Sequence, residues 1–183
     1  IYSLSDNTNI RSSFSNTVAR PSFKEASIAQ IYDPITNRFF IGNIELEPSY
    51  INNFDLRFER FGEAGELIAF SGFYKKLDNP IELVTFSASA PDNFQPRNVG
   101  EATVMGLEIE LRKNLGAFFS SLSNWNFNFN GSIAESRQKL DRSPGGEYDS
   151  RSANARDGEQ IKDYRDLQGQ SPYLINTGVS YNH

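Results

Sequence analysis

Asparagine and large aromatic residues alternate strictly over residues 124–130, which read Asn-Trp-Asn-Phe-Asn-Phe-Asn. Successive side chains of a β-strand point to opposite faces, so a strand here has one apolar face and one face of amides. An α-helix repeats about every 3.6 residues and would mix both kinds of side chain on every side. The pattern therefore predicts a strand around Trp125, and the question is what each of its faces contacts.

Two kinds of fold use such a strand. In a water-soluble β-sandwich, the apolar face packs into a core and the polar face contacts water. In a membrane β-barrel, the apolar face contacts lipid and the polar face lines the lumen. Both interpretations are all-β, and they differ in the environment that they assign to the aromatic side chains.

The same alternation recurs along the chain. In one segment, Met105 and Leu107 alternate with Glu108 and Glu110. Two acids on one strand face are incompatible with a dry core, because burying a charged group is costly. This segment therefore has an apolar face and a face in contact with water. The predicted strands cover residues 1–5, 10–19, 51–61, 66–77, 103–112, 124–135 and 172 to the end.

The connections between these strands alternate in length. Short ones lie at 6–9 and 62–65, one of short to medium length lies at 113–123, and long ones lie at 20–50, 78–102 and 136–170. In an up-and-down barrel, every second connection lies on the same side of the membrane, with short periplasmic turns and long extracellular loops. A sandwich gives no reason to sort connections in this way, and long irregular loops are uncommon in compact domains. The alternation favours an antiparallel up-and-down transmembrane β-barrel segment.

Composition narrows the classes further. The chain has 15 Phe and 8 Tyr among 183 residues, and it lacks the roughly 20 consecutive apolar residues of a membrane-spanning helix. The absence of cysteine excludes disulfide frameworks, iron-sulfur clusters and cysteine-based zinc sites. A formal charge of −5 argues against a nucleic-acid partner. We expect a β-rich protein without a cofactor.

The sequence contains no catalytic constellation. Its single histidine, His183, is the last residue, so neither a Ser/His/Asp triad nor a histidine-based metal site is predicted. Glu108 and Glu110 resemble the carboxylate pair of a glycoside hydrolase. A pair of acids facing a water-filled lumen explains them better, because acids belong on that face of a barrel. We therefore expect no enzymatic activity.

The long connection 136–170 contains many acids, whose oxygens are ligands that calcium accepts. It lacks the spacing of an EF-hand, and arginines are interleaved with the acids, so a solvated mixed-charge surface is the preferred interpretation. No metal site is predicted. Long loops on a rigid scaffold often carry recognition, and we expect this connection and the regions around Phe39, Phe40 and Phe94 to contact ligand at the outer mouth of the barrel. The acids are Asp141, Glu147, Asp149, Asp157, Glu159, Asp163 and Asp166.

Several segments resemble the C-terminal half of the β-barrel in TonB-dependent outer-membrane receptors, particularly the Bacteroidetes-type members. Their order and spacing cover nearly the whole chain. Two departures, Ile44 and Ser49, stand where the family usually has proline and an acid, within a loop. The segments are TVARPSF (17–23), GN through LEP (42–48), NFDLRFE (53–59), SGFYKK (71–76), NPIE (79–82), NVGEA (98–102), GLEIE (106–110) and GQSPYLIN (169–176).

The resemblance implies a 22-stranded barrel in the bacterial outer membrane, of which residues 1–183 supply about five complete strands. We expect the plug domain, the TonB box and the barrel-closing strand to lie outside this chain. The implied function is to bind a scarce, bulky ligand outside the cell and import it to the periplasm. Its implied partners are outer-membrane lipid, the extracellular ligand, and TonB acting through the plug.

The expected lumen-facing residues are the candidates for ligand contact. They are Arg57, Glu108, Glu110, Asn126, Asn128 and Asn130. The alternative function is a secreted all-β binding module, in which a sandwich buries the aromatic faces as a core. A third and weaker hypothesis is a β-rich glycosidase that uses Glu108 and Glu110.

Overall fold

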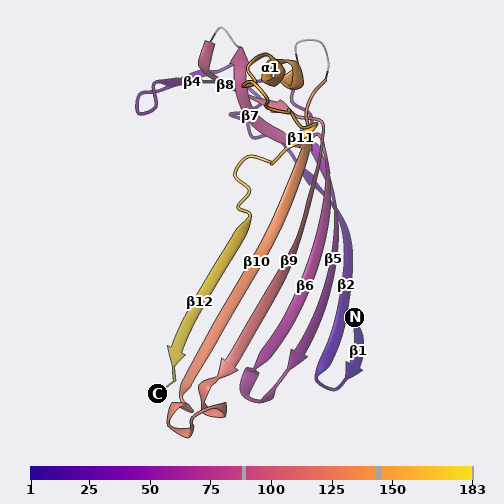
Figure 1. The fold of residues 1–183 in the computed structure, drawn as a ribbon, viewed down its shortest axis with the longest axis vertical. Coiled ribbons are helices and arrows are strands. Elements are labelled where there is room, and N and C mark those ends of the chain that lie inside the picture. Colours follow the sequence, from indigo (N-terminus) through magenta and orange to yellow (C-terminus); the bar gives the residue numbers. More distant parts are fainter. Residues whose placement is uncertain (88–89, 143–145, 183) are drawn as a thin grey trace.

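The computed structural model describes residues 1–87, 90–142 and 146–182, and its main element is a tall antiparallel sheet (Figure 1). Consecutive long strands are hydrogen-bonded neighbours, as in an up-and-down barrel wall. In the described ranges the sheet is open, since β1 pairs with β2 and β12 pairs with β10. Its strands are β1 (Tyr2–Ser5), β2 (Thr8–Ala19), β5 (Ser49–Phe61), β6 (Leu67–Asp78), β9 (Glu101–Asn114), β10 (Trp125–Lys139), β11 (Tyr164–Arg165) and β12 (Tyr173–Tyr181).

The strands predicted from alternation are confirmed, most to within three residues at each end. The main difference is β10, which continues to Lys139 and so includes the first residues of the predicted 136–170 connection. The short connections lie together at one end of the sheet (Figure 1). Gly65 lies in the turn after β5 with φ +80°. Glycine suits this position because a residue with a side chain is strained in that conformation. The turns contain the 3₁₀ helices η1 (Glu63–Gly65), η2 (Leu115–Ala117) and η3 (Ser120–Leu122).

The long connections gather at the opposite end, and the expectation that they are irregular was wrong (Figure 1). Two of them contribute hairpins to a second sheet, in the order β3-β4-β8-β7. Pro96 lies inside β8, and proline usually argues against a strand, which is why this hairpin was missed. Residues 143–145 of the third connection lie outside the described residues, as does His183. The elements are β3 (Gln30–Asp33), β4 (Arg38–Ile41), β7 (Ile81–Ser87), β8 (Ala90–Asn98) and helix α1 (Glu147–Ala153).

Register places the apolar residues of neighbouring strands side by side. Ile10 pairs with Phe58, Phe58 with Phe70, and Phe70 with Ile109. Because side chains alternate, the whole row points to one face of the sheet. Among the described residues, no second sheet covers this face, since the smaller sheet lies at the loop end (Figure 1). The sandwich hypothesis, which requires an aromatic core between two sheets, is therefore wrong.

None of the helices in the described part of the chain is long and apolar enough to span a membrane.

Candidate functional site

The apolar face forms a band that runs across the long strands. Its side chains are well exposed: Leu107 is 61% exposed and Ile133 59%. Along β10, the band extends from Trp125 to Ile133, about 26 Å at roughly 3.3 Å per residue. With a strand tilt of about 40°, this spans roughly 20 Å of height, close to the apolar height of outer-membrane barrels. We call these outward-facing residues the apolar band.

Aromatic residues mark the ends of the band. Trp125 and Tyr181 lie at the turn end, with ring centroids 5.1 Å apart. Tyr173, at the other end of β12, is 67% exposed. Tyrosine and tryptophan favour the boundary between lipid and water because their rings are apolar and their tips are polar. Tyr173 and Tyr181 are the first and last residues of β12, so the two aromatic ends of the band lie one strand length apart.

Above the band, towards the loops, the same face becomes charged. Lys139 Nζ lies 2.9 Å from the Glu101 carboxylate, and Lys76 Nζ lies 3.5 Å from the same carboxylate. Lys76 also pairs with Asp78 at 3.3 Å. Because charged side chains are costly in hydrocarbon, this row of ion pairs fixes the upper limit of the apolar band.

The opposite face carries a network of charged side chains, which we call the wall network. Arg57 on β5 donates to Glu110 on β9 at 2.7 Å and to Glu59 at 3.0 Å. Arg11 on β2 also pairs with Glu59, and Arg112 pairs with Glu110 at 2.7 Å. The network joins three strands and leaves Glu59 only 4% exposed. Arginine suits this role because its fork of donors can serve two carboxylates at once.

Small residues on β6 make the network possible. Arg57 and Glu110 lie on strands that are separated by β6, a distance of about two strand spacings or 10 Å. The β6 residues that face them are Ala69 and Ser71. Neither blocks the path, and the Ser71 hydroxyl accepts a hydrogen bond from Arg57 Nη1 at 3.2 Å. A larger residue at either position would fill the space that the guanidinium crosses.

The six residues expected to face the lumen all lie on the face of the wall network. Arg57 and Glu110 are in direct contact, and Glu108 lies two residues from Glu110 on β9. The three asparagines occupy alternate positions of β10. Asn126 accepts a hydrogen bond from Asn114 at 3.1 Å. Asn128 lies opposite Arg112, and Asn130 lies opposite Glu110.

Sequence reasoning missed Arg11 and Glu59 as members of the network, and Ser71 as its contact on β6. Each stands at a polar position of a correctly predicted strand. Their contacts depend on which residue of the neighbouring strand lies opposite, and alternation within one strand does not specify that. The network can hold charge and present donors and acceptors. Glu110 has two arginine partners, which favours a wall-lining role over that of a glycosidase acid.

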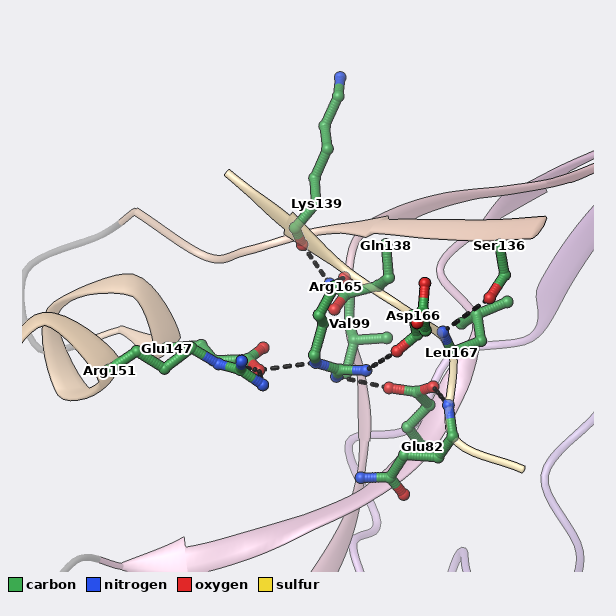
Figure 2. Close-up of polar contacts among 11 residues, drawn as sticks. Glu82, Val99, Ser136, Gln138, Lys139, Glu147, Arg151, Arg165, Asp166 and Leu167 are labelled. Atoms are coloured by element: carbon green, nitrogen blue, oxygen red, sulfur yellow. Dashed lines mark hydrogen bonds and ion pairs between the residues drawn. The ribbon is translucent and has the colours of Figure 1, made fainter. Parts of the chain in front are cut away.

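A second cluster lies at the loop end, where Arg165 is enclosed between two carboxylates (Figure 2). Its Nη2 lies 2.5 Å from Glu82 and its Nε 2.6 Å from Glu147. The side chains of Arg165 and Glu82 are 11% and 7% exposed. Burial disfavours the charged guanidinium, but the hydrogen bonds to Glu82 and Glu147 outweigh it and raise the pKa of Arg165. The cation therefore persists at every physiological pH.

The smaller sheet carries an aromatic hollow of about 230 Å³. Phe40 pairs with Phe94 where β4 runs parallel to β8, and this contact brings together two connections that are far apart in sequence. Phe39 and Leu83 also line the hollow, and the Arg38 guanidinium lies 4.9 Å from the Phe94 ring centroid. The three phenylalanines expected at the mouth therefore meet at one place among the loops.

Across 1–87, 90–142 and 146–182, no group of three or more His, Cys, Asp or Glu side chains is arranged to hold a metal ion. Glu147 pairs with Arg151 and Arg165, and Asp163 pairs with Arg142.

Residues 1–183 match the family model described as TonB dependent receptor-like, β-barrel. Among solved structures, the siderophore receptor PirA from Pseudomonas aeruginosa is similar, with a TM-score of 0.54 and 18% identity over 73% of this chain. A mutant of the ferric enterobactin receptor PfeA from the same organism has a TM-score of 0.51 and 17% identity over 73% of this chain. The matches span 23% and 20% of those two chains. No significant match was found among curated proteins.

Proposed function

Because the chain belongs to the family of TonB dependent receptor-like β-barrels, we propose that it forms part of the wall and the extracellular mouth of a ligand transporter. Proteins of this family lie in the outer membrane, and the chain is a segment of such a barrel. In our proposal, the complete receptor binds a scarce, bulky ligand outside the cell and imports it to the periplasm. We propose no catalytic activity for it.

The observation that carries this proposal is the exposure of the two sheet faces. The apolar face is open along its whole height, whereas the polar face contains the nearly buried Glu59 and Gln138, which is 1% exposed. Water would favour the reverse arrangement, because exposed apolar surface is unfavourable. Lipid against the apolar band and water on the polar face satisfy both faces.

The wall network and the asparagines of β10 then line the interior, and the loop-end sheet and α1 lie at the extracellular mouth. Arg57, Glu108, Glu110, Asn126, Asn128 and Asn130 remain our candidates for contact with ligand or with the plug. We propose that TonB supplies energy through a plug domain outside this chain. The 22-stranded barrel and the Bacteroidetes-type assignment remain predictions.

A ferric siderophore is the first ligand class to test, because the similar structures are a siderophore receptor and a ferric enterobactin receptor. Their identity to this chain, 18% and 17%, supports the shared fold alone.

The test is uptake of radiolabelled ferric siderophores, with vitamin B12, oligosaccharides and peptides as further ligands. The complete receptor is expressed in cells with and without tonB. We expect uptake of at least one ligand only with tonB, and receptor recovered in the culture supernatant would contradict the proposal.

A further inference from the structure

Arg165 joins two loops that are distant in sequence. It lies in the connection from β10 to β12, and its partner Glu82 lies 83 residues away on β7, in the connection from β6 to β9. Its other partner, Glu147, is the first residue of α1. One buried guanidinium therefore holds a carboxylate from each loop, and Figure 2 shows it pointing between them. Buried pairs of this kind are costly to break, because the remaining charge stays in a poor environment.

Backbone contacts reinforce the junction. One oxygen of Glu82 accepts from Arg165, and the other accepts from the Gln168 amide at 2.8 Å. The Leu167 amide donates to Ser136 Oγ at 3.0 Å, which anchors the same segment to the end of β10 (Figure 2). The segment is thus attached to a barrel strand on one side and to β7 on the other. Its position relative to β7 depends on the charge of Arg165.

The strand that Arg165 holds also lines the aromatic hollow. Successive side chains of β7 point to opposite faces, so Glu82 contacts Arg165 while Leu83 faces the hollow. Thr85 of β7 pairs with Phe94 of β8, and Phe94 pairs with Phe40 of β4. The hollow and the ion pairs therefore lie on opposite faces of the same strand, β7. Displacement of β7 would change the shape of its apolar lining.

We infer that Arg165 is a positioning residue, which fixes the β7–β8 hairpin and its aromatic hollow against the loop that contains α1. The two loops then form one unit at the barrel mouth. The importance of this unit for recognition rests on the proposed function. The mechanical coupling between the loops does not, and the two claims can therefore fail separately.

Arg151 provides a matched control. It pairs with the same Glu147 carboxylate at 3.0 Å, but its side chain is 45% exposed and its partner is in its own helix. Exposed pairs of this kind contribute little, because water solvates both charges well. Replacing Arg151 removes an arginine from the cluster without breaking the link between loops.

The test uses the complete receptor in lipid nanodiscs and hydrogen–deuterium exchange of its peptides. In Arg165→Met, we expect exchange to rise at least about tenfold in both the 81–87 and 146–170 segments, with β5, β6 and β9 unchanged. In Arg151→Met, we expect less than about a twofold change in 81–87. Unchanged strand protection also shows that the variant has folded. A rise confined to 146–170, or no rise, would overturn the inference.

Two further variants distinguish coupling between the loops from local damage at Arg165. Glu82→Gln changes only β7, and we expect it to raise exchange in 146–170 as well, because coupling acts in both directions. The double variant Glu82→Gln/Arg165→Met removes both charges, so no unpaired carboxylate remains near β7. We expect its exchange in 81–87 to be lower than in Arg165→Met alone. Equal or greater exchange in the double variant would contradict the role of charge.

A distance measurement reports on the unit directly. Spin labels replace Ile35, which is 91% exposed in the turn beside the hollow, and Ser150 on α1. We expect a narrow distance distribution in the parent and in Arg151→Met, and a broad one in Arg165→Met. Narrow distributions in all three proteins would show that Arg165 does not position the hollow. None of these readouts requires a ligand.

Discussion

The two faces of the main sheet differ in both chemistry and exposure. On one face, Phe14 is 71% exposed and Leu107 61%, whereas on the other Glu59 is 4% and Gln138 1% exposed. A water-soluble protein would bury the first set and expose the second. This inversion shows that the two faces are suited to different environments, lipid for the apolar face and water for the polar face. Substitutions that place the same charged residue on one face or on the other test this difference directly.

The largest effect is expected from a charge placed in the apolar band. Leu111→Arg puts a guanidinium among outward-facing Ile68 and Phe129, near the middle of the band. We expect the free energy of unfolding from bilayers to fall by about 3 kcal/mol, because a cation is costly at the membrane midplane. Urea titration of the complete receptor, followed by gel mobility, measures it.

The control introduces the same residue on the other face. Ser132→Arg lies opposite Glu108, which can pair with the new cation. We expect a change of less than about 1 kcal/mol. Equal losses in Leu111→Arg and Ser132→Arg would show that the faces do not have different environments.

The next largest effect is expected in the wall network. Arg57→Met removes a partner of both Glu59 and Glu110 and should lower the free energy of unfolding by about 2 kcal/mol. Arg112→Met removes an arginine that is 57% exposed, and we expect a loss below about 1 kcal/mol. Similar losses for both arginines would mean that the network does not cross β6 as a unit.

The strands and the wall network differ in how far they can be predicted from the sequence. The strands were predictable because, over the height of the apolar band, one face is apolar and the other polar. Met105 and Leu107 alternate with Glu108 and Glu110 in this way. The polar face that carries the wall network was predictable, but the contact between Arg57 and Glu110 was not. That contact depends on the register of three strands and on the small residue Ala69 between the two side chains.

The loop-end sheet was not predictable by alternation. β4 and β8 meet through just two parallel residue pairs, and Pro96 interrupts the expected strand signal. Arg165 looked like one of several arginines in a solvated loop. Its burial depends on Glu82, which is 83 residues away, and nothing in the local sequence indicates that contact.

A smaller effect is expected at the lower edge of the band. Trp125→Leu keeps an apolar side chain and removes the aromatic contact with Tyr181. We expect a loss of about 1 kcal/mol, the usual contribution of an aromatic pair. Ile175→Leu, which keeps the character of an outward-facing position, should change stability by less than about 0.5 kcal/mol. If Trp125→Leu is neutral in bilayers, Trp125 does not serve as an interfacial anchor.

The smallest effect is expected above the band. Lys139→Gln breaks an ion pair with Glu101, but Lys139 is 74% exposed and Glu101 keeps Lys76 as a partner. We expect a loss below about 0.5 kcal/mol that disappears in high salt. A salt-independent loss of the size expected for Arg57→Met would place these residues in a dry environment.

The most direct test of the inverted sheet is cysteine labelling in intact outer membranes. The chain has no cysteine, so single cysteines can replace outward Phe70, Leu107 and Ile133 or inward Ser71 and Ser132. Any cysteine elsewhere in the receptor is first replaced. We predict that a water-soluble maleimide labels the inward positions and leaves the outward ones unlabelled until the membrane is dissolved. Labelling of the outward positions in intact membranes, with the inward ones protected, would contradict the account.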